Sequence, residues 1–421
     1  MSEGEEQTTA ASADGLVDGA GSPAAGGANQ TGVRVYNERL ILSLVRRSRH
    51  LSKVEVARQT GLSVQTTSAI MNKLQIEGFL RREAPQRGRV GQPAIPFSLS
   101  PDGAYSIGLK IGRRSCDLVL IDFTGAVRAR VHETFAYPLI DRVMAIVAGA
   151  LPDVTAELSA RQRRRIVGLG IAAPFQLWNW SAEIGAPAGA MDGWRVVDIP
   201  REVGALSPYP VSLSNDATAA CAAELFFGEG WRHSDFLYFF VGAFVGGGVV
   251  LGGTLFQGRT ANAGAVGSMP IPLGSGAGQL IASASIYQLE RRLAEAGRDA
   301  AHVWRTPHDW GDLSNLEPFL GAWIEEASQA LAQACVAAIS VIDFEAIVID
   351  GAMPAEVRDR LVARVAARVA ELDRRGLSDV VVQPGAIGAD ARAIGGAALP
   401  LLAHFARDRE VLFRDAPGSA A

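Results

Sequence analysis

The chain has 421 residues, more than one hydrophobic core usually organises, so two or three folded units are expected. Hydrophobic residues make up 48% and charged residues 20% of the chain, which is typical of an α/β protein and excludes a fibrous or wholly disordered one. The formal net charge is only −4, so any preference for a charged partner must come from how the charges are distributed.

Cysteine spacing and hydropathy exclude several other classes. Cys116, Cys221 and Cys335 lie far apart without a CxxC pair, which argues against a disulfide framework and a local zinc site. The first residues, MSEGEEQTTA, lack the basic start and apolar run of a signal peptide, so we expect a cytoplasmic protein. Residues 236–256 form an uncharged run as long as a membrane span, but their glycines favour two buried strands around a tight turn.

Charge changes sign near the start of the chain. Residues 1–33 contain acidic but no basic side chains, among Gly, Ala, Ser and Thr, and are predicted to form a disordered tail. Residues 34–89 carry twelve Lys and Arg against four Glu, a balance of +8. Because this basic stretch coincides with a folded pattern, it favours a nucleic acid over other partners.

Three helices are predicted within the basic stretch. The first covers about residues 36–47, and Ser52 with Glu55 forms a capping box that starts the second. Gly61 ends that helix, and Ser63 caps a third that runs to about residue 77. This order is typical of a helix-turn-helix, whose last helix reads base edges by hydrogen bonds. The DNA-contacting candidates on it are Ser63, Gln65, Thr66, Thr67, Asn72 and Lys73.

A basic hairpin follows the third helix. Residues 78–80 return the chain into a strand, and arginines flank a turn rich in Pro and Gly, which suits contact with phosphates or the minor groove. The candidates there are Arg81, Arg82, Arg87, Arg89 and Gln92. We therefore predict a DNA-binding domain over residues 34–100.

The remainder, residues 101–410, is predicted to be an α/β body, followed by a C-terminal tail at 411–421. Strand-like runs alternate with helical stretches, which indicates sheets covered by helices. The predicted strands are residues 106–111, 118–122, 166–171, 211–213, 236–241, 249–251 and 346–349.

Two runs together resemble the regulator branch of the ROK family (repressors, open reading frames, kinases). They are NERLILSLVRRSRHLSKVEVARQTGLSVQTTSAIMNKLQIEGFLRRE and GRVGQPAIPFSLSPDGAYSIGLKIG, and the resemblance covers nearly all of residues 35–405. It implies a winged helix-turn-helix joined to a two-lobed body of the actin-like ATPase superfamily, related to sugar kinases.

The resemblance also implies that kinase chemistry has been lost. Lys110 stands where the family has the acidic residue that serves the metal-nucleotide, and Arg113 and Arg114 replace small residues of the first phosphate turn. Ala243 and Phe244 replace the Thr-Gly pair of the second phosphate turn.

The family's sugar and zinc positions are altered as well. Ala265 replaces a sugar-binding Glu of the family, and Ser268 replaces a His that binds sugar and zinc. Residues 274–280 replace the family's cysteine cluster. We therefore expect no catalytic residue, no cofactor and no metal.

The position of the family's catalytic base is kept as Asp216, after Asn215. Taken without the resemblance, Asn-Asp after a strand is equally a turn or a helix cap. We predict that an effector binds near Asn215, Asp216 and Trp194. An anionic effector such as a sugar phosphate is an open alternative, because it could be attracted by Lys110, Arg113 and Arg114.

The sequence thus predicts a DNA-binding transcriptional regulator that senses a small carbohydrate-like effector and works as a homodimer or tetramer. One recognition helix reads too few base pairs for a selective site, which is why paired half-sites are expected. The alternatives are a DNA-binding regulator without a small ligand and an ATP-dependent sugar kinase.

Overall fold

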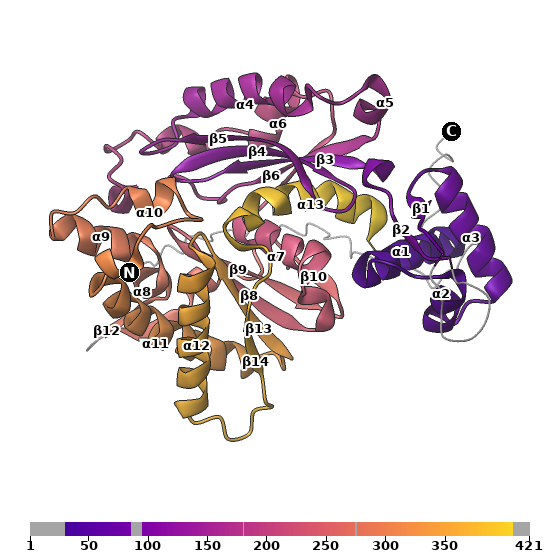
Figure 1. The fold of residues 1–421 in the computed structure, drawn as a ribbon. Coiled ribbons are helices and arrows are strands. Elements are labelled where there is room, and N and C mark those ends of the chain that lie inside the picture. Colours follow the sequence, from indigo (N-terminus) through magenta and orange to yellow (C-terminus); the bar gives the residue numbers. More distant parts are fainter. Residues whose placement is uncertain (1–29, 86–94, 180, 274–275, 407–421) are drawn as a thin grey trace, which may run out of the picture. The chain divides into compact units, whose positions relative to one another are not determined.

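The computed structural model describes residues 30–85, 95–179, 181–273 and 276–406. From Glu38 onward these residues belong to one compact unit (Figure 1). Residues 1–29 of the predicted acidic tail, the predicted C-terminal tail at 411–421, and the predicted wing residues Arg87, Arg89 and Gln92 lie outside the described residues.

The N-terminal part contains the three predicted helices and a two-stranded hairpin. They are α1 (Gln30–Ser48), α2 (Lys53–Thr60), α3 (Val64–Ile76), β1 (Leu80–Arg82) and β2 (Phe97–Leu99). Below, residues 38–99 are called the head. Ser52 and Glu55 form the reciprocal capping box, and Gly61 takes the left-handed φ of 72° that ends α2.

The start of α1 corrects one prediction. The helix begins at Gln30, so residues 30–33 are helical although the tail was predicted to reach residue 33. Adding a turn to an existing helix costs much less than nucleating one, so polar residues beside a stable helix extend it.

Two five-stranded sheets follow, and the predicted strands are all found in them. The first has the order β5-β4-β3-β6-β7 and the second the order β10-β9-β8-β13-β14. In each sheet three antiparallel strands are followed by two parallel ones, so the same topology occurs twice. The strands of the first sheet are β3 (Tyr105–Ile111), β4 (Ser115–Asp122), β5 (Val127–Thr134), β6 (Ile166–Ala172) and β7 (Val211–Ser214). Those of the second are β8 (Phe236–Val241), β9 (Val245–Leu251), β10 (Thr254–Phe256), β13 (Ala346–Gly351) and β14 (Val381–Pro384).

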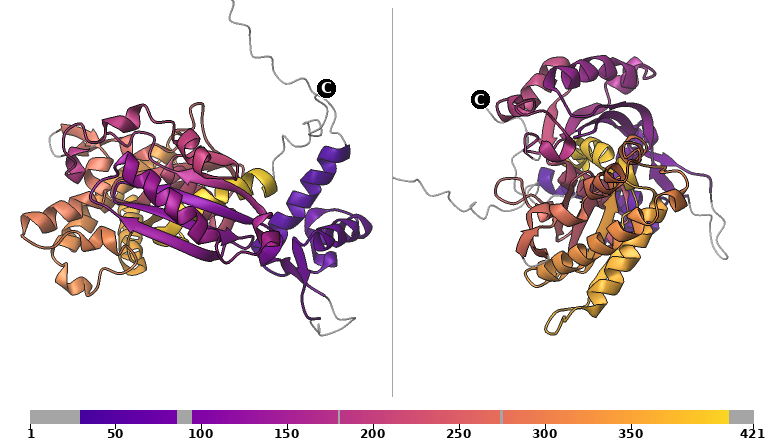
Figure 2. Two further views of the ribbon diagram at one scale, coloured as in Figure 1. Left: turned by 90° about the horizontal axis from the view of Figure 1, so that it is seen from above. Right: turned by 90° about the vertical axis from the view of Figure 1, so that its left-hand side faces the viewer.

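Helices cover both sheets (Figures 1 and 2). Beside them lies a small hairpin of β11 (Pro270–Leu273) and β12 (Gly276–Gln279). The helices of the body are α4 (Ile140–Thr155), α5 (Ala160–Arg163), α6 (Ile199–Leu206), α7 (Asp216–Phe227), α8 (Ile281–Ala284), α9 (Tyr287–Glu295), α10 (His302–Arg305), α11 (Phe319–Ile339), α12 (Ala355–Glu371) and α13 (Ala391–Phe405).

Side-chain alternation along β4 shows how the first sheet is covered on both faces. Leu118 and Leu120 pack into the core with α4, whereas Val119 and Ile121 point the other way, toward α13 and the head. On the second sheet, β8 sends Leu237 and Phe239 toward α11. Its other face packs against α7, which in turn packs on α13.

The apolar run at 236–256 forms strands, as predicted, but three of them, β8, β9 and β10, where two were expected. Within the described ranges, no helix combines the length and the apolar content that crossing a bilayer requires.

Candidate nucleic-acid interface and ligand cavity

The third helix of the head presents an exposed polar face. Ser63 caps α3 by accepting a hydrogen bond from the Thr66 N–H at 3.0 Å. Gln65, Thr66 and Asn72 are exposed, and the side-chain oxygen of Asn72 accepts a hydrogen bond from Lys53 Nζ at 2.6 Å. These side chains lie where a helix in the major groove would meet base edges.

Thr67 is a correction to the predicted contacts. Its side chain is fully buried, on the same face of α3 as Ile70, Met71 and Leu74. Residues three and four apart share one side of a helix, so the inward face that contains Ile70 and Leu74 also takes Thr67. Thr67 therefore belongs to the core of the head and cannot reach a base.

The basic residues in the described part of the head differ in their exposure and in their ion-pair partners. Lys73 is half-buried and pairs with Glu38 on α1 at 2.6 Å, so it also ties two helices together. Arg81 is exposed on β1 and donates from Nε to Glu83 and to Ser98, both at 3.0 Å. Arg82 is exposed on the same strand.

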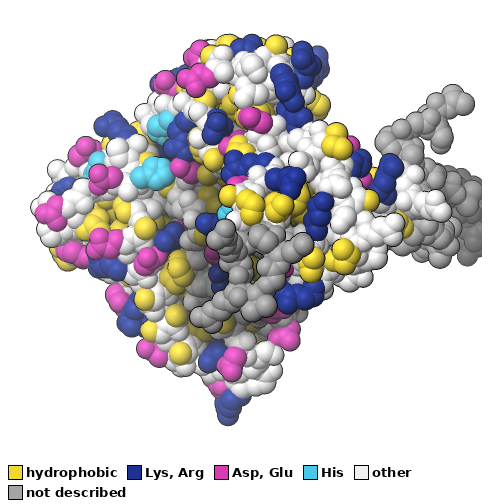
Figure 3. Space-filling view, turned by 45° about the vertical axis from the view of Figure 1, so that its right-hand side comes forward, with side chains coloured by type: hydrophobic (Ala, Val, Ile, Leu, Met, Phe, Trp, Pro, Cys, Tyr) yellow, Lys and Arg dark blue, Asp and Glu magenta, His cyan; other side chains and the backbone are white. Residues whose placement is uncertain are grey.

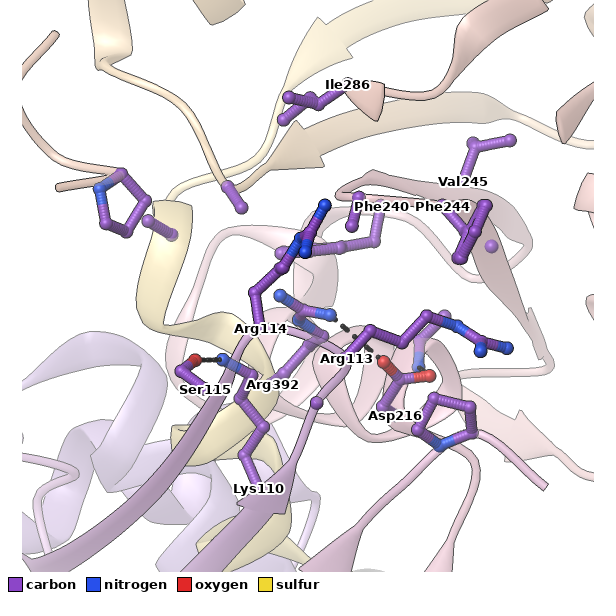
Figure 4. A pocket seen from close by; sticks show the side chains of 18 of the residues that line it. Lys110, Arg113, Arg114, Ser115, Asp216, Phe240, Phe244, Val245, Ile286 and Arg392 are labelled. Atoms are coloured by element: carbon purple, nitrogen blue, oxygen red, sulfur yellow. Dashed lines mark hydrogen bonds and ion pairs between the residues drawn. The ribbon is translucent and has the colours of Figure 1, made fainter. Parts of the chain in front are cut away.

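A cavity of about 810 Å³ lies in the body. Its walls come from the β3–β4 turn, the N-terminus of α7, the β8–β9 turn and the N-terminus of α13 (Figure 4). Asn215 and Asp216 line it as predicted, together with Lys110, Phe244, Ala265 and Ser268. Candidate positions from four separate segments of the sequence therefore line the same cavity.

Lys110 forms a buried ion pair inside the first sheet. Its Nζ lies 2.7 Å from Asp117 Oδ2 and 2.5 Å from Ser115 Oγ, and His132 contacts the other oxygen of Asp117. Burial opposes ionisation of Asp117, but Lys110 and His132 outweigh it and hold the pKa of that carboxyl below its usual value. The charge of Lys110 is thus balanced within the sheet.

The two arginines of the first turn are also held by internal partners. Arg113 donates to the backbone oxygens of Leu177 at 2.9 Å and Asn179 at 2.7 Å. Arg114 donates to the Ala136 oxygen at 2.6 Å and lies 3.1 Å from the carboxylate of Glu290. Both guanidinium groups are therefore committed to partners other than a ligand.

The second turn is filled by an aromatic side chain. The Arg113 guanidinium carbon lies 4.6 Å from the centre of the Phe244 ring, which also packs on Tyr287 at 5.2 Å. Next to it, the Val245 N–H donates to Ser285 Oγ at 2.9 Å. This backbone amide of the turn therefore already has a hydrogen-bond partner, which it would have to give up to bind a phosphate.

Asp216 is the first residue of α7 and is paired across the cavity. Arg392, the second residue of α13, donates from Nη1 to Asp216 Oδ2 at 3.1 Å, and its guanidinium carbon lies 4.7 Å from the ring of Phe240. Asn215 caps α7 by accepting from the Ala217 N–H at 3.0 Å. Both the helix-cap interpretation of Asn215 and the placement of Asp216 in the cavity are therefore realised.

Trp194 is a second correction. It is 3% exposed in the core of the first sheet, does not line the cavity, and donates its indole N–H to the Pro138 oxygen at 2.8 Å. A tryptophan satisfied in this way is a packing residue.

Sequence reasoning missed several residues of the cavity. Arg392, Asp117, His132 and Glu290 line it but lie in segments without a local motif. Across the described parts of the chain, no three or more His, Cys, Asp or Glu side chains gather in a way that could hold a metal ion.

Comparison of the sequence with known protein families identifies both the head and the body. Residues 106–286 match the model of the ROK family, and residues 36–81 match a winged helix-turn-helix DNA-binding model. An uncharacterized protein of Sinorhizobium fredii, y4fQ, is 25% identical over 381 residues, covering 88% of this chain and 91% of that protein. The xylose repressor of Bacillus spizizenii is 24% identical over 247 residues, which cover 58% of this chain and 62% of the repressor.

Among solved structures, a ROK family transcriptional regulator described as a homologue of the Escherichia coli MLC protein has a similar fold. Its TM-score is 0.61 at 16% identity, and the match covers 90% of this chain and 99% of that structure. The fold and the sequence matches agree with the resemblance carried by the motifs. Residues 106–286 therefore carry a ROK family domain, and residues 36–81 carry a winged helix-turn-helix domain that precedes it.

Proposed function

We propose that this protein is a sequence-specific DNA-binding transcriptional regulator whose kinase-like body binds a small carbohydrate effector and mediates oligomerisation. The observation that carries the proposal is the combination of a winged head with a cavity that keeps Asp216 but has Lys110 and Phe244 at its phosphate turns. A ROK body of this kind can bind a sugar without being able to phosphorylate it.

On the DNA side, α3 enters the major groove and the hairpin contacts phosphates or the minor groove. Gln65, Thr66 and Asn72 face bases from the exposed side of α3. The proposed backbone contacts come from Ser63, Lys73, Arg81, Arg82, Arg87, Arg89 and Gln92. We propose that the DNA-binding domain covers residues 34–100.

In the cavity, we propose a neutral carbohydrate rather than an anionic one. Lys110 is balanced by Asp117, Arg114 by Glu290 and Arg392 by Asp216, so a phosphate that bound to any of these three cations would have to break an existing pair. Asn215 and Asp216 offer amide and carboxylate groups of the kind that hydrogen-bond sugar hydroxyls.

We also propose that the protein is not an enzyme. Phosphoryl transfer needs a metal-bound nucleotide and a positioned terminal phosphate in addition to a base. Here a cation stands at the metal-nucleotide position, and the Phe244 ring and the Ser285 hydroxyl occupy the second turn. Incubation with radiolabelled ATP and a sugar panel should give no sugar phosphate. ATP-dependent product that disappears in Asp216→Ala would restore the kinase alternative.

A dimer or tetramer is proposed because such heads bind paired half-sites, with the body supplying the contact. Light scattering of the protein on DNA checks this. A monomer that protects a single unpaired half-site would contradict it.

The effector is tested with DNA selected from a random duplex pool by the full-length protein. Fluorescence anisotropy then measures the Kd with and without each member of a panel of neutral sugars, among them D-xylose, and their phosphates. One neutral sugar should change the Kd at least 5-fold, and Asp216→Ala should abolish that change. If no sugar changes the Kd although the DNA is bound specifically, the regulator without a small ligand is correct.

A further inference from the structure

Two helices, α7 and α13, begin at the ligand cavity. Asp216 opens α7 and Arg392 lies in the first turn of α13, and the two side chains pair at 3.1 Å (Figure 4). Both side chains are only 13% exposed. An ion pair therefore joins the N-terminal ends of the two helices in the cavity, where a ligand would form hydrogen bonds with the same side chains.

The C-terminal end of α7 contacts the first helix of the head. The guanidinium carbon of Arg46 lies 3.9 Å from the centre of the Phe226 ring and 5.5 Å from that of Phe227, and it is 4.9 Å from the Phe123 ring. Arg46 Nη1 donates to the Phe123 oxygen at 2.9 Å, and its Nε and Nη2 are buried without a hydrogen-bond partner in the described structure.

These contacts make Arg46 sensitive to the position of α7. Burial lowers the pKa of Arg46 to about 9, so the side chain is still charged at neutral pH. The Phe123 oxygen, the charge of Asp122 and the aromatic faces, among them that of Phe226, compensate for the lost hydration. A shift of Phe226 therefore changes the environment of a buried charge on α1.

The C-terminal end of α13 contacts the head at two further places. Arg39 on α1 donates to the backbone oxygens of Ala403 at 3.3 Å and Ala406 at 3.2 Å. The Phe405 ring lies 5.3 Å from the ring of Phe79, which stands between α3 and β1. The end of α13 thus touches both the first helix and the start of the wing.

Between these ends the two helices are in backbone contact. A Cβ added at Gly395 of α13 would lie 2.0 Å from the Ala219 oxygen of α7. On its other side α13 rests on the first sheet, where a Cβ at Gly170 would lie 1.9 Å from the Gly396 oxygen. Without side chains to yield between them, the helices cannot slide independently. They span about 18 Å and about 22 Å from cavity to head.

We propose that α7 and α13 form a strut that couples occupancy of the cavity to the conformation of the head. A ligand that competes for Asp216 or Arg392 loosens the pair that joins the two N-terminal ends. The packed helices carry that change to Arg46 and to Phe79, next to the recognition helix and the wing. The inference rests on the proposed function, because it assigns the regulation of that same cavity.

A double-mutant cycle in the full-length protein tests the strut without any ligand. Arg392→Met breaks the pair at the cavity end and Arg46→Met removes the charge at the head end, while both keep the length of the side chain. The readout is the Kd for the duplex selected by the wild type. Distant sites that do not communicate give multiplicative effects. We expect the double variant to depart at least 3-fold from the product of the two single fold-changes.

Two matched controls define the background. Arg58→Met removes an exposed charge of the same head, and its combination with Arg392→Met should be multiplicative within 2-fold. Arg292→Met removes an arginine that pairs with Glu326 elsewhere in the body, and with Arg46→Met it should behave in the same way. Multiplicative behaviour of the Arg392 and Arg46 pair, like that of the controls, overturns the proposal.

A second measurement covers the case in which Arg46→Met does not fold. Hydrogen exchange followed by mass spectrometry compares wild type with Arg392→Met and with Asp216→Asn. Amides of residues 42–47 and 79–82 should exchange at least 2-fold faster in both variants and at the wild-type rate in Arg292→Met. Unchanged exchange there overturns the strut. Neither the double-mutant cycle nor the hydrogen-exchange comparison contains a sugar. A failed sugar screen therefore refutes the effector proposal, and the two ligand-free tests still decide whether α7 and α13 couple the cavity to the head.

Discussion

Gly395→Ala tests the closest helix contact in the body. At an ordinary position inside a helix, replacing glycine by alanine stabilises a protein by about 0.5–1 kcal/mol. Here the new methyl group would lie 2.0 Å from the Ala219 oxygen, whereas real Cβ atoms keep at least 3.0 Å. The helices must therefore separate by at least 1.0 Å, the difference of the two distances, and the atom that must move belongs to the backbone.

Forcing extra volume into a packed interior costs about 1–3 kcal/mol, and backbone that is held on both sides favours the upper end of that range. We expect a net loss of about 2 kcal/mol in the free energy of unfolding after the gain in helix propensity is subtracted. Gly149→Ala is the matched control, since Gly149 lies exposed inside α4 with no atom within 4 Å of the added methyl group. That variant should gain about 0.5–1 kcal/mol.

Urea unfolding followed by tryptophan fluorescence and by circular dichroism measures both variants under one set of conditions. Coincident transitions from the two signals justify comparing free energies. The reasoning is refuted if Gly395→Ala is stabilised by the same amount as Gly149→Ala, because α7 and α13 would then not be in backbone contact.

Further expected outcomes concern the head, the buried ion pair and metal content. Gln65→Ala should weaken binding to the selected duplex by about 1–3 kcal/mol, measured by anisotropy, because a base contact is lost. Thr67→Val should leave DNA binding unchanged and raise stability by about 1 kcal/mol, because a buried hydroxyl without a partner in the described structure is removed. The pKa of Asp117 lies below its unfolded value, so its pairing stabilises the fold above about pH 4 and is lost as the pH falls further. Asp117→Asn should therefore show a shallower loss of stability than wild type during acid titration, and an equally steep loss would contradict this. Elemental analysis should find no stoichiometric zinc, and one chelator-resistant zinc per chain would show that the metal segment was misplaced.

Signals that act within a few residues were read correctly from the sequence. The Ser52 capping box, the Gly61 helix end and the Ser63 cap are found as predicted because each depends on hydrogen bonds or backbone angles of its immediate neighbours. The seven predicted strands are present for a similar reason, since buried strands are marked by apolar, β-branched runs. The repeated topology of the two sheets was not predicted, because it is defined by strand order and not by a sequence period.

The cavity was predicted only where the resemblance supplied a position. Asp216 was found in this way, but its partner Arg392 lies 176 residues later in a helix without a recognisable motif. Thr67 was misplaced because its polarity was weighed above its helical spacing from Ile70 and Met71. The inward direction of Thr67 could thus have been predicted from spacing, whereas long-range pairing depends on tertiary packing, which composition and spacing do not encode.

The central claim is that one molecule binds DNA through the head and changes that binding when a neutral sugar enters the cavity. Isothermal titration of sugars into the full-length protein, with and without saturating selected duplex, tests it most directly. Linkage requires that the sugar Kd differ between the two states by the same factor by which the sugar changes the DNA Kd. We expect a factor of at least 5, which disappears in Asp216→Ala. A sugar that binds in the cavity with the same Kd in the presence and absence of DNA would contradict the claim.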